Sequence, residues 1–208
     1  MTQRIDYFFS LASPWSFLGH DRLMAVARRA GADVVFHPVA LGPVFAETGG
    51  LPLAKRAPAR QRLRLVELQR WRLKLGLDFH IQPTHWPFDA SLADRLVIAA
   101  LLDGHSVDAL LPRLFSGVWQ KQEDLAEPAV LAALADEVAL PGAALVTRAD
   151  AADVVEAYAG NGALALASDV FGAPSYVLSG EVFWGQDRID LLEDALTSGR
   201  APFRPDPA

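Results

Sequence analysis

The sequence contains no cysteine, only two methionines, fewer basic than acidic side chains and no apolar run long enough to span a membrane. Without cysteine the chain has no disulfide, no thiolate metal ligand and no dithiol redox pair, which excludes a disulfide oxidoreductase. The net charge of −6 argues against a nucleic-acid surface. The N-terminus lacks the basic region and apolar core of a signal peptide, so we expect a cytoplasmic protein with no membrane contact. These absences leave a small molecule as the expected partner.

A length of 208 residues with 51% hydrophobic side chains predicts one globular unit that has room for an insertion. Apolar residues alternate over 5–9 as in a strand, follow helical spacing over 23–30, and form a second short strand over 34–36. Gly31 is expected to end the helix and Pro38 the second strand. Strand, helix and strand at this spacing favour a parallel pair with a right-handed crossover.

The remainder of the chain changes character twice. Residues 41–160 are rich in alanine and leucine at helical spacing, which predicts a block of helices. Residues 176–178 and 182–184 then predict a hairpin closed by a turn at 179–180, and the apolar spacing over 189–196 predicts a last helix.

The stretch FFSLASPWSFLG places Ser13 and Ser16 where a thiol redox protein would carry a C-x-x-C pair, between an apolar strand and a helix. Serine before proline at a helix start is typical of an N-cap, which is one interpretation of Ser13. The carboxyl end of a strand in an open α/β sheet is also where ligands bind, and a helix N-terminus favours an anion. Ser13 is therefore either a cap alone or also a hydrogen-bond donor to a bound thiolate.

Several motifs carry a resemblance to a known family. They are SPWSFLG (13–19), HPVALGPVF (37–45), ELQRW (67–71), WPFD (86–89) and VFGAPSYVLSGEVFWGQDR (170–188), together with the Ala173-Pro174 step before the third strand. The chain resembles the 2-hydroxychromene-2-carboxylate isomerases and their relatives, the kappa-class glutathione transferases. The resemblance implies an α/β, thioredoxin-like fold with a large all-helical insertion, of the DsbA type. Residues 1–45 together with 161–208 would form the thioredoxin-like domain and residues 46–160 the insertion; the family is also typically dimeric.

The same resemblance implies glutathione as the cofactor. Ser13 would hold the glutathione sulfur as a thiolate, which would act as the nucleophile that the cysteine-free chain lacks. Ala173, before a Pro174 expected to be cis, would pair through its backbone with the cysteinyl portion. Gln186 and Asp187 match the positions that bind the γ-glutamyl end. For Asp187, an N-cap of the last helix is an equally open interpretation.

The substrate implied by the resemblance is a small anionic aromatic molecule. Trp15 stands where it would form a wall of the substrate pocket, the alternative being packing under the insertion. Arg60 occupies the place of a family lysine and is our candidate for a substrate carboxylate, although the basic helix around it also fits a solvated face. Four positions depart from the family pattern and leave the identity of the substrate open: Ala46, Gly50, Leu63 and Glu67.

Two further interpretations concern polar residues elsewhere. We expect Arg188 at the surface, and we expect no metal site, because His37, His80 and His85 lack acidic or cysteine partners at regular spacing. Three functions remain: a glutathione-dependent isomerase, a kappa-like glutathione transferase that releases the adduct, and a non-enzymatic thioredoxin-fold binding module.

Overall fold

The computed structural model describes residues 2–205, and its centre is one four-stranded sheet. The strands are β1 (Arg4–Phe9), β2 (Asp33–Pro38), β3 (Ser175–Leu178) and β4 (Glu181–Trp184), in the spatial order β2-β1-β3-β4. β1 is parallel to β2, and β3 is antiparallel to both β1 and β4. The predicted parallel pair and the C-terminal hairpin are therefore confirmed.

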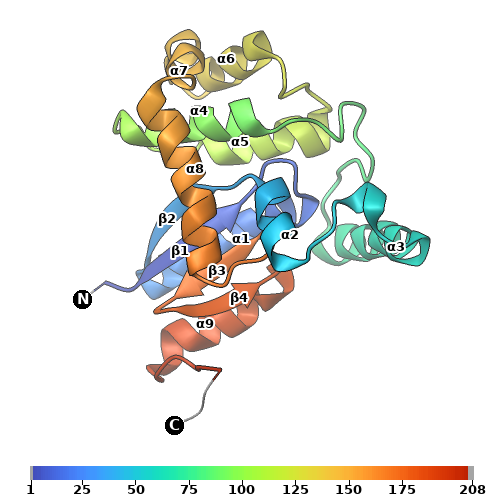
Figure 1. The fold of residues 1–208 in the computed structure, drawn as a ribbon, viewed down its shortest axis with the longest axis vertical. Coiled ribbons are helices and arrows are strands. Elements are labelled where there is room, and N and C mark those ends of the chain that lie inside the picture. The colour runs from blue at the N-terminus through green and yellow to red at the C-terminus, as the bar shows by residue number, and fades with distance from the viewer. Residues whose placement is uncertain (1, 206–208) are drawn as a thin grey trace.

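Helices cover both faces of this sheet, because the side chains of a strand alternate between its faces. Ile5, Tyr7 and Phe9 of β1 enter the core that contains α1 (Pro14–Ala30) and α9 (Ile189–Ser198). Phe8 enters a smaller core, whose members come from the opposite face of the sheet and from α2 (Leu41–Thr48) and α8 (Ala152–Ala167). In Figure 1, α8 and α2 cross the front of the sheet and α1 runs behind it.

The middle of the chain is helical, as predicted, and the thioredoxin-like fold with a helical insertion is confirmed. Its elements are η1 (Leu53–Lys55), α3 (Pro58–Leu75), α4 (Ser91–Leu102), α5 (Leu110–Ser116), the π-helical turn η2 (Gly117–Lys121), α6 (Pro128–Glu137) and α7 (Gly142–Arg148). Figure 1 shows α4 to α7 stacked above the sheet and α3 standing to one side. The predicted boundaries after residues 45 and 160 fall inside α2 and α8, so the division into two domains stays a prediction.

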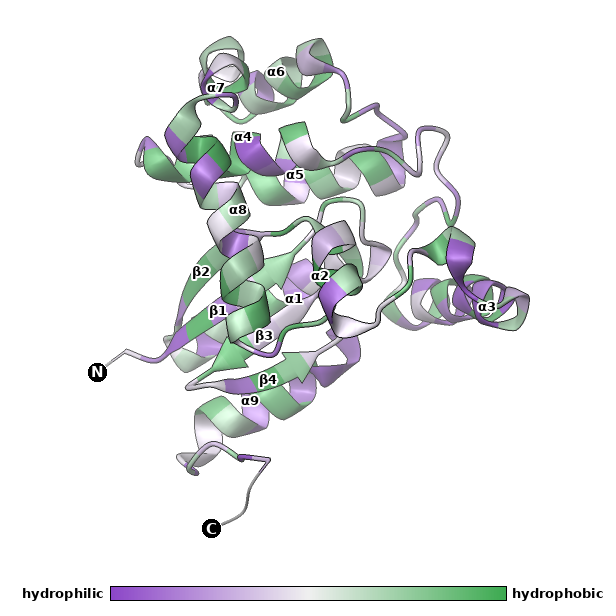
Figure 2. Ribbon diagram, in the orientation of Figure 1, coloured by the Kyte–Doolittle hydropathy of each residue, from purple (hydrophilic) through white to green (hydrophobic). Residues whose placement is uncertain are grey.

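Helix α3 is held by a narrow apolar stripe. Leu68 is buried, and Trp71 and Leu75 pack partly buried against the main core, as their spacing predicts. In Figure 2 hydrophilic residues occupy much of α3, whereas β1 and β3 are mainly hydrophobic. α3 therefore carries a row of charged side chains along the side of the molecule. None of the helices within residues 2–205 combines the length and the apolar character needed to cross a bilayer.

Candidate active site at the N-terminus of α1

Ser13 lies where β1 ends and α1 begins, and its hydroxyl makes two hydrogen bonds. Its Oγ accepts the backbone N–H of Ser16 at 3.3 Å, which confirms the N-cap interpretation, with Pro14 in the first turn of the helix. The same hydroxyl donates to the carbonyl oxygen of Ala173 at 3.2 Å. The Ala173–Pro174 peptide bond is cis, as expected. One side chain thus joins the two segments that the sequence singled out, which lie 160 residues apart.

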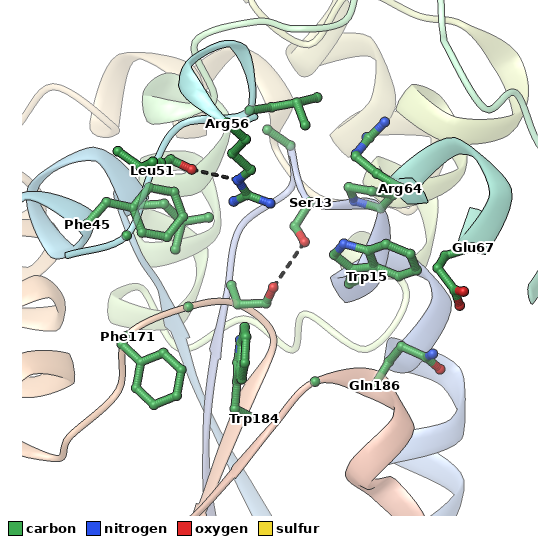
Figure 3. Close-up of a pocket in the computed structure, with 18 of the residues that line it drawn as sticks. Ser13, Trp15, Phe45, Leu51, Arg56, Arg64, Glu67, Phe171, Trp184 and Gln186 are labelled. Atoms are coloured by element: carbon green, nitrogen blue, oxygen red, sulfur yellow. Dashed lines mark hydrogen bonds between the residues drawn. The ribbon is translucent and has the colours of Figure 1, made fainter. Parts of the chain in front are cut away.

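A cavity of about 580 Å³ opens beside Ser13. Its lining includes every side chain assigned to the site from the sequence except Pro174: Ser13, Trp15, Arg60, Ala173, Gln186 and Asp187. In Figure 3 Ser13 lies near the centre, with Arg56 and Arg64 on one side and Phe171 and Trp184 on the other. The volume falls within the range of about 300–1,000 Å³ that is usual for small-molecule sites.

Gln186 and Asp187 follow β4 in the short helix η3 (Gln186–Arg188). Gln186 is buried, and its side-chain oxygen accepts a hydrogen bond from Arg22 at 2.8 Å. Asp187 is half-exposed and accepts from Arg188 at 2.8 Å, so Arg188 lies at the surface as expected while also lining the cavity. The alternative that Asp187 caps the last helix is wrong, because Arg188 is the N-cap residue of α9 and no side chain bonds there.

Trp15 and Arg60 reach the same cavity from different helices. Trp15, in the first turn of α1, lines the cavity and also packs against the main core, so its role as a wall of a substrate pocket stays a prediction. Arg60, in the first turn of α3, is exposed at the cavity and forms no ion pair within residues 2–205. Its guanidinium is therefore available to an anion.

Two tryptophans of the insertion hold the loop that leads to Ser13. The indole N–H of Trp86 donates to the carbonyl of Ala12 at 2.9 Å, and that of Trp119 donates to the carbonyl of Leu11 at 3.3 Å. Sequence reasoning found Trp86 only as part of the WPFD motif and did not find Trp119. No local sequence pattern predicts these contacts, because donor and acceptor are 74 residues apart in the Trp86 bond and 108 residues apart in the Trp119 bond.

Arg64 is the second feature that sequence reasoning missed. It is the one basic residue of α3 that is buried, and its guanidinium carbon lies 4.5 Å from the centre of the Trp86 ring. Burial, together with the positive charge of Arg56, lowers the pKa of Arg64 to about 10. In the sequence Arg64 is one of eight basic residues between Lys55 and Lys74, and only its burial distinguishes it.

No base stands ready to activate Ser13. Among the described residues, no histidine lines the cavity. His20, one turn further along α1 than Ser16, is buried, and that burial lowers the pKa of its imidazole to about 4. Nor does any group of three or more histidine, cysteine, aspartate or glutamate residues within 2–205 form a metal site. The interactions of the Ser13 hydroxyl within residues 2–205 are thus its hydrogen bonds to Ser16 and Ala173, with no histidine placed to take its proton.

Comparisons with known proteins agree with this geometry. Residues 4–197 match the model of the DSBA-like thioredoxin domain. The chain is 26% identical over 204 residues to a 2-hydroxychromene-2-carboxylate isomerase of Sphingobium xenophagum, covering 94% of this chain and 99% of that protein. It is 24% identical over 195 residues to the Pseudomonas putida enzyme of the same name, covering 92% and 93%. The family resemblance predicted from the motifs is thus confirmed.

Solved structures show the same fold. A structure of 2-hydroxychromene-2-carboxylate isomerase superimposes with a TM-score of 0.79 at 24% identity, covering 94% of this chain and 95% of that one. The cytosolic disulfide reductase DsbM of Pseudomonas aeruginosa, solved with GSH, gives a TM-score of 0.66 at 20% identity, covering 93% and 98%.

Proposed function

Because the chain belongs to the family of DSBA-like thioredoxin domains and carries serine in place of a cysteine pair, we propose that it is a glutathione-dependent isomerase. The substrate is 2-hydroxychromene-2-carboxylate or a related unsaturated aromatic pyruvate. The observation that supports the proposal most is the bond between Ser13 and Ala173, because it gathers a helix N-terminus, a hydroxyl and an extended backbone at one cavity.

The residues at the cavity fit glutathione. The N–H of Ala173 donates to no other group within residues 2–205, so it is free to pair with an extended peptide. Asp187, at the same cavity, offers a carboxylate to an ammonium group. Gln186 is fixed beside it by Arg22. The solved relative with GSH adds support from the same fold.

Glutathione would supply a thiolate that adds reversibly to an electrophilic carbon of the substrate, so that the former double bond rotates before the thiolate leaves. Ser13 prepares that thiolate, because its hydroxyl proton can turn from the Ala173 carbonyl towards a sulfur atom. The N-terminus of α1 favours the anionic form further. The released carbonyl of Ala173 then accepts a backbone N–H from the bound peptide.

The other walls of the cavity suit an aromatic acid. Trp15, Phe45, Phe171 and Trp184 offer aromatic surfaces, and Arg60 stands at the rim for a carboxylate. A pyruvate conjugated to an aromatic ring presents both groups. The site thus divides into a sulfur and peptide region near Ala173, with Phe171 and Trp184 on that side, and a region for the substrate carboxylate towards α3 (Figure 3).

The test combines turnover with a titration of bound thiol. Purified protein is mixed with 2-hydroxychromene-2-carboxylate with and without reduced glutathione, and the products are separated by chromatography. We expect an isomer of unchanged mass, formed only with glutathione. In parallel, thiolate absorbance is followed across pH, and we expect bound thiol to ionise well below the free value of about 8.5.

Ser13→Ala should raise the pKa of the bound thiol and slow turnover. Ser16→Ala is the matched control, because the Ser16 hydroxyl is buried, has no partner and does not line the cavity. Loss of the cap costs Ser13→Ala about 1 kcal/mol, so the melting temperature of each variant is measured as well. Release of a stable glutathione adduct would instead identify a kappa-like transferase. Failure to bind glutathione would leave a binding module.

A further inference from the structure

Arg64 is a buried cation that forms no ion pair within residues 2–205. The residue is only 9% exposed, and its Nη2 atom has no hydrogen-bond partner in this part of the chain. Its one described partner is the face of the Trp86 ring at 4.5 Å. A cation–π contact recovers part of the hydration that a guanidinium loses, but it leaves the N–H donors unsatisfied. A buried guanidinium with unsatisfied donors destabilises the fold unless a ligand accepts hydrogen bonds from it.

The residues around Arg64 add further positive charge to the cavity. Arg56 and Arg60 line the same cavity as Arg64. The two acidic residues of the lining do not compensate them, because Glu67 bonds to Arg70 and Asp187 to Arg188. Burial lowers the pKa of both Arg56 and Arg64, and the charge of Arg60 lowers that of Arg56 further, as the charge of Arg56 does for Arg64. Besides the paired Arg188, the lining thus holds three arginines that form no ion pair within residues 2–205.

The position of Arg64 separates it from the region proposed for glutathione. Asp187 and Ala173, which fit the peptide, come from the C-terminal part of the chain, whereas Arg64 projects from α3. In Figure 3 Arg64 lies beyond Trp15, on the opposite side of Ser13 from Trp184. Arg60 is one turn earlier on the same face of α3, nearer the rim.

We propose that Arg64 is the specificity-determining residue for the substrate carboxylate, holding it at the inner end of the cavity while Arg60 meets it at the rim. Its planar fork of donors matches a carboxylate, and the contact with Trp86 restricts the guanidinium in advance. Since Trp86 also bonds to Ala12, a carboxylate on Arg64 has a fixed position relative to Ser13. The inference rests on the proposed function for the identity of the substrate, but the charge argument does not need glutathione.

The experiment compares two ligands that differ only in the carboxylate. Benzylidenepyruvate is an aromatic α-keto acid with a conjugated double bond, and benzylideneacetone is its neutral counterpart. Calorimetry without glutathione gives the affinity of each ligand for wild type, Arg64→Met, Arg64→Lys and Arg60→Met. The cysteine-free chain has no thiol that could trap these electrophiles.

We expect wild type to prefer the acid by about 10- to 100-fold, the range of charge-assisted hydrogen bonds. Arg64→Met should remove that preference and leave the ketone within about twofold, while Arg64→Lys restores part of it. Arg60→Met should reduce the preference less than Arg64→Met, because an exposed charge is screened by water.

The inference is wrong if wild type does not prefer the acid, or if Arg64→Met keeps that preference. It is also wrong if Arg64→Met loses affinity equally for the acid and the ketone, or if it loses affinity for glutathione instead. Equal loss would mean that Arg64 only packs on Trp86, and Arg64→Lys together with circular dichroism shows whether the fold itself has failed. Glutathione binding by wild type is measured separately. If wild type does not bind glutathione, the proposed function is wrong. The relative affinity for the acid and the ketone still tests the role of Arg64.

Discussion

Asp94 in α4 is a buried carboxyl group that contacts the loop leading to Ser13. It is 1% exposed and accepts a hydrogen bond from Tyr158 at 2.9 Å, while its Oδ1 atom has no partner within residues 2–205. The neighbouring Arg95 does not neutralise it, since its guanidinium bonds to the carbonyl of Ala149 and to Asp150. Burial outweighs the effect of the Tyr158 hydrogen bond and of the nearby Leu11 backbone, and it raises the pKa of Asp94 to about 7.

This elevated pKa gives stability a defined pH dependence. Folding favours the protonated carboxyl, so the contribution of Asp94 is complete below pH 3.8, its ordinary pKa, and is lost as the pH rises through about 7. At about 1.4 kcal/mol per pKa unit, the shift from 3.8 to about 7 lowers the free energy of unfolding at high pH by about 4 kcal/mol. About 3 kcal/mol of this loss falls between pH 5 and pH 8. Asp94→Asn keeps the shape and the acceptor for Tyr158 but carries no charge.

Urea denaturation followed by tryptophan fluorescence tests this at pH 5 and pH 8. The stability of Asp94→Asn relative to wild type should increase by about 3 kcal/mol between the two conditions, and other titrating groups cancel in the comparison. Asp150→Asn, which removes an exposed carboxylate, should show no comparable change. A relative stability of Asp94→Asn that stays constant from pH 5 to 8 would refute the reasoning, because the carboxylate would then be ionised at little cost.

Three further changes probe the region around α1. In Gly19→Ala the new Cβ would lie 2.6 Å from the Tyr176 hydroxyl, so urea denaturation should show a loss of about 1–3 kcal/mol and calorimetry a weaker affinity for glutathione. Trp86→Phe keeps the ring but loses the bond to Ala12; we expect about 1 kcal/mol lower stability and a higher pKa of bound thiol in the absorbance titration. His20 has its pKa lowered to about 4, so its contribution is present above pH 6.5 and about 3 kcal/mol is lost towards pH 4. Denaturation of His20→Phe should lack this acid loss.

The parts of the site that could be predicted from the sequence are those governed by local geometry. Ser13 before Pro14 predicts a helix N-cap. The residues after Ala173 predict the hairpin that β3 and β4 form. Both depend on a few consecutive residues. The assignment of Asp187 as a cap failed for a related reason: η3 precedes α9 and shifts the N-cap by one residue, to Arg188.

What could not be predicted depends on burial. Arg64 and Arg60 belong to the same basic run in the sequence, and only the tertiary structure buries one and exposes the other. Asp94 likewise begins a helix among ordinary apolar residues, and nothing nearby in the sequence indicates that its carboxyl will lack a cation. A sequence shows which residues are charged. Whether each charge is buried or exposed to water depends on elements that are distant along the chain.

The insertion has two roles at the cavity, and they restrict its residues differently. Trp86 and Trp119 both donate to the backbone of the loop before Ser13, so a change at either of them alters the position of the Ser13 hydroxyl. Arg60 lines the cavity from α3 and makes no such bond within residues 2–205, so substitution there alters what enters the cavity and leaves Ser13 in place. Leu63 is exposed and does not line the cavity. Under the proposed function, the two departures from the family pattern that line the cavity, Gly50 and Glu67, therefore allow a different substrate while the surroundings of Ser13 stay unchanged, provided that the bonds to Leu11 and Ala12 persist.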